Sequence, residues 1–195
     1  MTILDSPTSG CICPACWAAV ILSGRDVATS RAWTTAHITL GMSAGRYEGA
    51  LRDIIHAFKY EGRRSLAHPL GGMVREAGSQ ILQGCDCVVP VPLHPWRRMG
   101  RGFNQARDVA QRLERPVIDG LWRIRQTRSQ MALPADARRT NIRGAFICSP
   151  FAAINDRSVT LVDDVRTTGA TLDECAKVLL GAGAREVRAL TVAIA

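Results

Sequence analysis

Residues 158–195 read SVTLVDDVRTTGATLDECAKVLLGAGAREVRALTVAIA, and this stretch decides the fold. Residues 158–165 form an apolar run that is typical of a buried strand. A Thr- and Gly-rich turn follows, and then apolar residues recur at helical spacing as far as Gly181 and Gly183, which are typical of a helix end. Residues 186–195 form a second apolar run. A strand, a helix and a strand in this order indicate a βαβ unit, and therefore an α/β protein whose parallel sheet is covered by helices.

The chain before this unit shows further elements at helical or strand spacing. We expect helices over 51–58, 66–81 and 103–113, and strands over 87–93, 117–124 and 145–148. Residues 1–45 are weakly patterned, so we interpret them as a short N-terminal appendage. The main domain then covers residues 46–195, with a parallel sheet of about five strands.

The composition is that of a folded globular domain. The chain has 195 residues, of which 47 % are hydrophobic and 22 % are charged, and these values argue against intrinsic disorder. No apolar run approaches the ~20 residues that a membrane span requires. The first ten residues lack a basic segment followed by an apolar one, so we expect no secretory signal and a cytoplasmic location. The seven scattered cysteines do not describe a disulfide scaffold.

The positive charge is concentrated in one segment of the chain. Residues 94–143 contain twelve arginines and four acidic residues, so this segment accounts for the whole formal net charge of +8. Such a block indicates an anionic partner, which could be a phosphate, a pyrophosphate or a nucleic acid. Aromatic residues, on which single-stranded nucleic acid stacks, make up only 5 % of the chain and disfavour the last of these.

The turn of the βαβ unit combines two kinds of polar group. The strand ends in the adjacent acids Asp163 and Asp164, and a helix is expected to begin at Thr171, with Glu174 in capping-box spacing. Ligands of open α/β sheets bind at the carboxyl ends of the strands, where the N-terminus of a helix suits a phosphate. Carboxylates instead accept hydrogen bonds from paired hydroxyls or hold a divalent cation through water. Ribose 5-phosphate matches both kinds of group, because it carries a phosphate at one end and vicinal hydroxyls a few ångströms away. A plain strand–turn–helix junction would not explain two adjacent acids at the end of a buried strand.

The stretch VDDVRTTGAT (162–171) resembles the 5-phosphoribosyl-1-pyrophosphate (PRPP) loop of the type I phosphoribosyltransferases. The resemblance implies that Asp163 and Asp164 hold the ribose hydroxyls at the catalytic centre, and that the turn wraps the 5′-phosphate. The residues that it assigns to the phosphate are Thr167, Thr168, Gly169, Ala170 and Thr171.

Three further stretches are similar to the ComF family, whose members are linked to bacterial competence and DNA uptake. They are KYEGRRSLAHPLG (59–71), VPVPLHPWRRMGRGFNQA (89–106) and RQTRSQMALPADARRTNIRGAF (125–146). Together they extend the resemblance over roughly residues 46–195, which implies a type I phosphoribosyltransferase-like domain.

The same resemblance implies groups for the pyrophosphate that PRPP carries on C1. Mg²⁺ chelates this pyrophosphate, so it is the expected cofactor and arrives with PRPP. Arg97, Arg98 and Arg101 are the candidate pyrophosphate-binding residues, although a solvated basic loop is the alternative. Residues 125–143 resemble a flexible lid that closes over PRPP. Its candidate arginines, among which the sequence does not choose, are Arg128, Arg138, Arg139 and Arg143.

The N-terminal cysteines raise the question of zinc. Many members of the family carry an N-terminal zinc ribbon with two CxxC pairs, and Cys13 and Cys16 resemble one such pair, with Cys11 close by. A structural zinc site needs four ligands, however, and no second pair follows. His37 could add one ligand at most. Residues 1–45 are therefore expected to hold a remnant of the ribbon, and Zn²⁺ at Cys13 and Cys16 lacks a complete ligand set.

Three functions remain open at this point. The first is a PRPP-binding, phosphoribosyltransferase-like enzyme that transfers or releases the phosphoribosyl group at C1. The second is a non-catalytic PRPP-binding accessory protein in competence or DNA uptake, with DNA or a DNA-processing protein as its partner. It is favoured because the chain ends directly after its last strand, without an evident region for recognising a nucleobase. The third is a basic nucleic-acid-binding module. The sequence names neither the acceptor nor the oligomeric state, and a homo-oligomer is left open.

Overall fold

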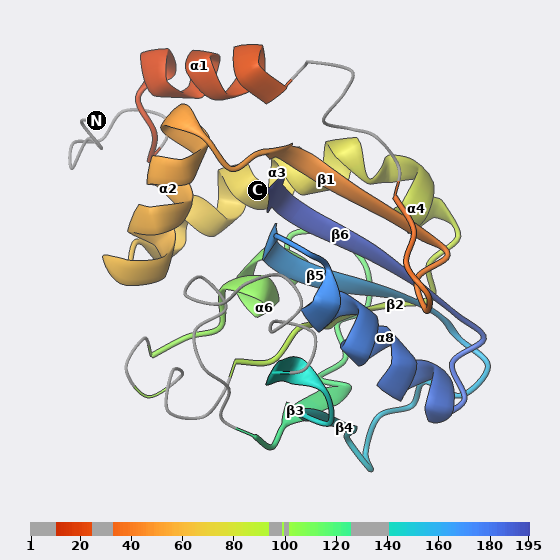
Figure 1. The fold of residues 1–195 in the computed structure, drawn as a ribbon. Coiled ribbons are helices and arrows are strands. Elements are labelled where there is room, and N and C mark those ends of the chain that lie inside the picture. Colours follow the sequence, from red (N-terminus) through yellow and green to blue (C-terminus); the bar gives the residue numbers. More distant parts are fainter. Residues whose placement is uncertain (1–10, 25–32, 94–98, 100–101, 126–140) are drawn as a thin grey trace.

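Figure 1 shows the computed structural model of the chain, in which residues 11–24, 33–93, 99, 102–125 and 141–195 are described. The elements, in chain order, are α1 (Pro14–Gly24), β1 (Leu40–Arg46), α2 (Gly49–Tyr60), η1 (Arg64–Leu66), α3 (Ala67–Ala77), α4 (Ser79–Gln83), β2 (Cys87–Pro90), α6 (Gln105–Ala110), β3 (Leu121–Arg123), β4 (Phe146–Cys148), β5 (Ser158–Arg166), α8 (Ala170–Gly181) and β6 (Glu186–Ile194). None of the helices in the described part of the chain combines the length and the apolar character that a membrane crossing requires.

Four strands form one parallel sheet in the order β1–β6–β5–β2. β5 and β6, the two strands of the predicted βαβ unit, pair along their whole length, and β2 lies on the other side of β5. Val88 of β2 also forms a single parallel bridge with Val117. The α/β class with a parallel sheet flanked by helices is therefore confirmed. In place of about five strands, the parallel sheet of the described chain has four strands and this one bridging residue.

Helices cover both faces of the sheet (Figure 1). One core lies between the sheet and α8 and contains Leu161 and Leu172, and the other lies under α2, α3 and α6 and contains Ile54 and Val162. Successive residues of β5 thus belong to different cores, as the alternation of side chains along a strand requires. The two acids that follow Val162 continue this strand to the carboxyl edge of the sheet.

The helical expectations hold for α2 and fail in part for the next helix. The four apolar residues that predicted a helix over 51–58 lie in α2 and are at most 3 % exposed. The single helix expected over 66–81 is wrong, because the chain forms η1, α3 and α4, with a break at Gly78. A Cβ at Gly78 would lie 2.5 Å from a side-chain carbon of Leu190 in β6. The break therefore lies where the chain approaches the sheet too closely for a side chain. The helix expected over 103–113 is confirmed as the shorter α6.

Residues 117–124 do not form the single strand that was predicted. Val117 bridges to β2, the chain then turns at Gly120, whose N–H donates to the carbonyl of Ile118 at 2.8 Å, and β3 follows. β3 pairs antiparallel with β4, which confirms the strand expected over 145–148, in a separate two-stranded sheet. This small sheet lies beside the main one at the β2 side (Figure 1).

The predicted boundary between an N-terminal appendage and the main domain, at residues 45 and 46, differs from what the structure shows. β1 lies within residues 1–45, yet it pairs with β6 from Leu40 opposite Arg188 to Arg46 opposite Ile194. Helix α1 packs on α2, and Val20 is only 2 % exposed in the core that they share. Residues 40–46 are thus part of the main sheet and not of an appendage.

Candidate functional site

The turn between β5 and α8 lies at the carboxyl edge of the parallel sheet. β5 ends at Arg166 and α8 begins at Ala170, so Thr167, Thr168 and Gly169 form the turn. Gly169 adopts φ 78° and ψ −2°, the left-handed conformation that favours glycine. The N–H of Ala170 donates to Oγ1 of Thr168 at 3.4 Å. The residues that the sequence assigned to a phosphate therefore surround the N-terminus of a twelve-residue helix, where N–H groups without helical acceptors and the helix dipole attract anions.

The helix starts one residue earlier than the sequence predicted. Gly169 is the N-cap of α8 and supplies no side-chain cap, so the expected capping box of Thr171 and Glu174 is wrong. The left-handed Gly169 ends the turn before Thr171, which lies in the first helical turn. The carboxylate of Glu174 instead accepts a hydrogen bond from the N–H of Gly144 at 2.7 Å. This bond fixes the residues just after 126–140 to the helix that begins at the turn.

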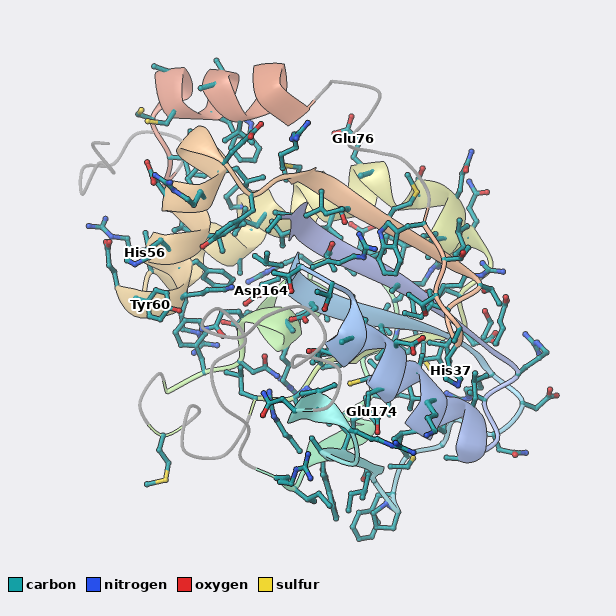
Figure 2. All side chains as sticks on the ribbon, in the orientation of Figure 1. His37, His56, Tyr60, Glu76, Asp164 and Glu174 are labelled. Carbon is teal, nitrogen blue, oxygen red and sulfur yellow. The ribbon has the colours of Figure 1, made fainter. Side chains whose placement is uncertain are left out.

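The two acids at the end of β5 have different surroundings. The carboxylate of Asp164 pairs with Lys59 near the end of α2, with Nζ and Oδ1 2.8 Å apart and the side chains 14 % (Lys59) and 15 % (Asp164) exposed. Figure 2 shows Asp164 at the sheet edge, on the side of this helix end. Oδ1 of Asp163 accepts the N–H of Asp164 at 2.8 Å, and its carboxyl interacts electrostatically with Arg123 of β3 and Cys175 of α8. Lys59 and Arg123 thus place positive charge near the acidic pair.

The charges of this cluster depend on one another. Burial and the neighbouring Asp164 raise the pKa of Asp163 to about 7. For Lys59, burial acts to lower the pKa, but the attraction and the hydrogen bond of Asp164 outweigh burial and raise it. At neutral pH the site therefore holds a charged Lys59 ammonium near the carboxyl group of Asp163, whose pKa of about 7 lies in the same range.

A segment that the sequence did not associate with the site lies against the turn. The backbones of Trp33 and Gly41 exchange two hydrogen bonds of 2.9 and 2.7 Å. The indole of Trp33 covers Gly41 so closely that a Cβ there would lie 2.5 Å from the ring. The guanidinium carbon of Arg166 lies 4.3 Å from the centroid of this ring, in a cation–π contact at the end of β5. The start of β1 and the end of β5 are thereby joined through Trp33.

The same segment binds the first turn of α8. Oδ1 of Asp173 accepts the hydroxyl of Thr35 and, at 3.0 Å, the N–H of His37, while Oδ2 lies 3.1 Å from Nδ1 of the His37 ring. Burial acts to raise the pKa of Asp173, but these hydrogen bonds outweigh it and hold the pKa below its usual range. His37, which the sequence considered as a metal ligand, thus has a carboxylate partner on α8.

Within the described part of the chain, the cysteine pair gains no further ligands of the kind that zinc requires. Cys13 and Cys16 lie at the start of α1, where the N–H of Cys16 donates to Sγ of Cys13 at 3.3 Å, and Sγ of Cys11 donates to the carbonyl of Ser65 at 3.4 Å. Among residues 11–24, 33–93, 99, 102–125 and 141–195, no three His, Cys, Asp or Glu side chains form a group that could hold a metal ion. A two-cysteine set alone does not fit a structural zinc ion.

The first expected basic loop begins at the carboxyl edge of the main sheet, and the second begins and ends beside the β3–β4 pair. Six of their candidate residues lie outside the described part of the chain: Arg97, Arg98, Arg101, Arg128, Arg138 and Arg139. Before the first loop, the N–H of Val91 donates to the carbonyl of Val162 at 2.9 Å, next to the acidic pair. At the second, a nitrogen of Arg125 donates to the carbonyl of Asn141 at 3.0 Å, which brings the two ends of 126–140 together. Arg143 is described and is exposed.

A pocket of about 690 Å³ opens beside the carboxyl end of β2. Its lining includes the ion pairs Arg64–Asp108, with a shortest N–O distance of 2.8 Å, and Arg107–Asp119, with one of 3.1 Å. The ring of Phe103 also lines it, and its residues come from the two ends of segment 94–101, from α6 and from β3. The hollow therefore extends from the sheet edge toward the antiparallel pair.

A parallel sheet with an acidic strand end and a left-handed glycine turn before a helix defines a type I phosphoribosyltransferase-like α/β fold. No protein-family model matches the chain. Competence protein F of Haemophilus influenzae is 36 % identical over 157 residues, which cover 74 % of this chain and 68 % of that protein. DNA utilization protein YhgH of Escherichia coli K12 is 33 % identical over 155 residues, which cover 73 % of this chain and 66 % of that protein. The chain belongs to the competence protein F (ComF) family.

Solved structures that resemble the chain include two proteins of nucleotide metabolism. An allosteric regulatory enzyme of purine biosynthesis superposes on 65 % of this chain and 26 % of its own, with a TM-score of 0.43 and 20 % identity. The purine phosphoribosyltransferase of Pyrococcus horikoshii superposes on 65 % of this chain and 81 % of its own, with a TM-score of 0.39 and 15 % identity. Scores this low do not bear on the activity. About a third of the length of each curated relative above lies outside the match.

Proposed function

We propose that the protein binds Mg²⁺·PRPP at the β5–α8 turn and transfers or releases its phosphoribosyl group at C1. One observation supports this most: at a single sheet edge, an acidic pair is followed by a left-handed glycine turn at the start of a helix. Carboxylates accept hydrogen bonds from vicinal hydroxyls, and the N–H groups of a helix start donate to a phosphate. These two halves match the two ends of ribose 5-phosphate.

The proposal gives each group a role. Asp163 and Asp164 accept hydrogen bonds from the ribose hydroxyls and stabilise the positive charge that develops at C1 when the C1–O bond breaks. The bonding electrons leave with pyrophosphate, which arrives as the Mg²⁺ complex and is neutralised further by arginines of the first basic loop. The residues proposed to hold the 5′-phosphate are Thr167, Thr168, Gly169, Ala170 and Thr171, and those proposed for the pyrophosphate are Arg97, Arg98 and Arg101.

Isothermal titration with PRPP in the presence of Mg²⁺ tests the site. We expect saturable binding to the wild type and an affinity lower by about tenfold or more in Asp163→Asn/Asp164→Asn, because a neutral amide is a weaker acceptor than a carboxylate. Asp156→Asn is the matched control, since Asp156 is an exposed acid with an 81 % exposed side chain. No heat from the wild type, or unchanged binding in the double variant, would refute the proposal.

The acceptor is a separate question with its own experiment. Release of pyrophosphate from PRPP can be followed in a screen of purines, pyrimidines and ammonia. Turnover with one class of acceptor would identify the nucleophile that attacks C1.

The names of the relatives support a second candidate function. Competence protein F and DNA utilization protein YhgH suggest a role in DNA uptake or use, in which PRPP binding would serve regulation without turnover. Under this alternative the protein binds PRPP but releases no pyrophosphate with any acceptor of the screen. Release with any of them removes the alternative.

A further inference from the structure

The end of α2 places a buried cation on the acidic pair. The ammonium of Lys59 lies 2.8 Å from Oδ1 of Asp164, and the Lys59 side chain is 14 % exposed. The chain contains 25 basic residues but only two lysines, Lys59 and Lys177. An ammonium is a compact charge with three donors, whereas a guanidinium is a planar fork that suits bidentate pairing. A single-donor contact with one carboxylate oxygen leaves such an ammonium able to bind a second acceptor.

The packing of α2 links this cation to Phe103, which lies close in sequence to the first basic loop. Phe58, the residue before Lys59, packs against Phe103, with ring centroids 5.6 Å apart. Arg64, just after α2, lies over the same Phe103 ring at 5.2 Å and pairs with Asp108 of α6. Phe103 lies two residues after segment 94–101, so α2 is held on one side to the chain just after this loop and on the other side to the acidic pair. Lys59 therefore pairs with Asp164 at the end of a helix that also packs against Phe103, two residues beyond the first basic loop.

We propose that Lys59 is a ligand-binding residue that selects a sugar phosphate with an anionic group on C1. This inference rests on the proposed function of the β5–α8 turn. In the free protein the ammonium neutralises Asp164. In the complex it keeps that bond and donates a further hydrogen bond to an oxygen of the pyrophosphate, while Asp164 accepts one from a ribose hydroxyl. PRPP makes the additional contact, and ribose 5-phosphate, which lacks the pyrophosphate, does not.

A comparison of two ligands separates this role from a merely structural one. The affinities for Mg²⁺·PRPP and for ribose 5-phosphate are measured by isothermal titration in the wild type, Lys59→Gln, Lys59→Arg and Lys177→Gln. Gln can still donate to Asp164 but carries no charge, and Arg keeps the charge. Lys177 is exposed on α8 and serves as the matched control. Thermal unfolding of each variant checks that it is folded.

We expect Lys59→Gln to weaken PRPP binding about tenfold or more and ribose 5-phosphate binding less than about threefold, because one charge-assisted hydrogen bond is lost with only one of the ligands. Lys59→Arg should recover part of the loss, and Lys177→Gln should match the wild type. Equal weakening of both ligands would show that Lys59 only positions Asp164, and no weakening would show that it has no role in binding; either result overturns the inference.

The outcomes also distinguish this inference from the proposed function. If the wild type binds neither ligand, the proposed function and the role of Lys59 are both refuted. If the wild type and Lys59→Gln bind PRPP with the same affinity, only the role of Lys59 is refuted. Should Lys59→Gln fail to fold because Asp164 is left without its ion pair, Lys59→Met/Asp164→Asn is compared with Asp164→Asn. The added Lys59→Met must then weaken PRPP binding and leave ribose 5-phosphate binding unchanged.

Discussion

At the scale of single residues, the shape of the proposed phosphate turn depends on Gly169. This residue has φ 78°, and a Cβ there would lie 3.3 Å from Nε of Arg166. Gly169→Ala should lower the free energy of unfolding by about 1–2 kcal/mol, because an L-residue is strained in this conformation, and it should weaken PRPP binding. Gly181→Ala is the control, since Gly181 ends α8 with no atom near the added methyl; we expect it to stabilise by about 0.4–1 kcal/mol. Urea denaturation measures the free energy of unfolding of both variants. Equal stability of Gly169→Ala and the wild type would contradict the predicted strain at this position.

Asp163 gives a second prediction at this scale. Its pKa is raised to about 7 in the folded protein, so the stabilising contribution of this group is fully present below the unfolded value of about 3.9 and is lost as the pH rises through about 7. The stability of the wild type should therefore fall between pH 4 and pH 7, relative to Asp163→Asn, by an amount on the order of 4 kcal/mol. Denaturation at several pH values measures this difference, and parallel profiles of the two proteins would contradict the raised pKa.

Some residues of the candidate site could be predicted from the sequence, and others could not. Asp163, Asp164 and Gly169 follow one another in a local motif, so spacing alone brings them together, although their roles toward a ligand stay a prediction. Lys59 reaches Asp164 only through the packing of α2, and no local spacing encodes that contact. Two features of the sequence could have pointed to it: lysine is rare in this arginine-rich chain, and Lys59 begins the stretch 59–71 that resembles the ComF family.

At the scale of elements, clear apolar patterns in the sequence predicted β5, α8 and β6. The sequence of β1 has no such pattern, so this strand was not predicted. The sequence of β1 is LGMSAGR, which contains two glycines and no β-branched residue, so its intrinsic preference for a strand is low. The strand forms because β6 supplies a complete parallel partner and because Trp33 packs on Gly41. Both causes are tertiary contacts with residues outside the strand, so the local sequence pattern of the strand cannot predict them.

The tether between residues 35–37 and α8 leads to a prediction for these elements. Because the pKa of Asp173 is lowered in the folded protein, its contribution is present above the unfolded value of about 3.9 and is lost as the pH falls through the folded value. Asp173→Asn should lower the free energy of unfolding by about 1–2 kcal/mol at pH 7, because hydrogen bonds to a charged acceptor are lost. The difference from the wild type should shrink as the pH falls below about 3.9 and through the lowered folded value. A difference that is independent of pH would contradict the role of the charge.

At the scale of the whole molecule, the surplus of positive charge belongs to one segment that adjoins the candidate site. If this charge serves pyrophosphate, Arg97→Ala/Arg98→Ala/Arg101→Ala should weaken PRPP binding by about tenfold or more, because charge-assisted contacts are lost, and leave ribose 5-phosphate binding unchanged. A nucleic-acid-binding module would instead bind a single-stranded oligonucleotide with an affinity that falls steeply with salt, and the same variant would lose that binding. Titrations with the three ligands at two salt concentrations separate these outcomes.

The strand order β1–β6–β5–β2 also has a consequence for how the chain folds. β1 pairs in this sheet with β6 alone, although Ser43 and Thr191, whose hydroxyls meet at 2.7 Å, are 148 positions apart. During synthesis, the segment that becomes β1 must wait until residues 186–194 have been made. Pairing over such a separation requires a large loop to close before any contact is gained, which is typical of slow folding. We therefore expect residues 40–46, which stay unpaired until then, to be the part of the sheet most exposed to chaperones and to aggregation during synthesis.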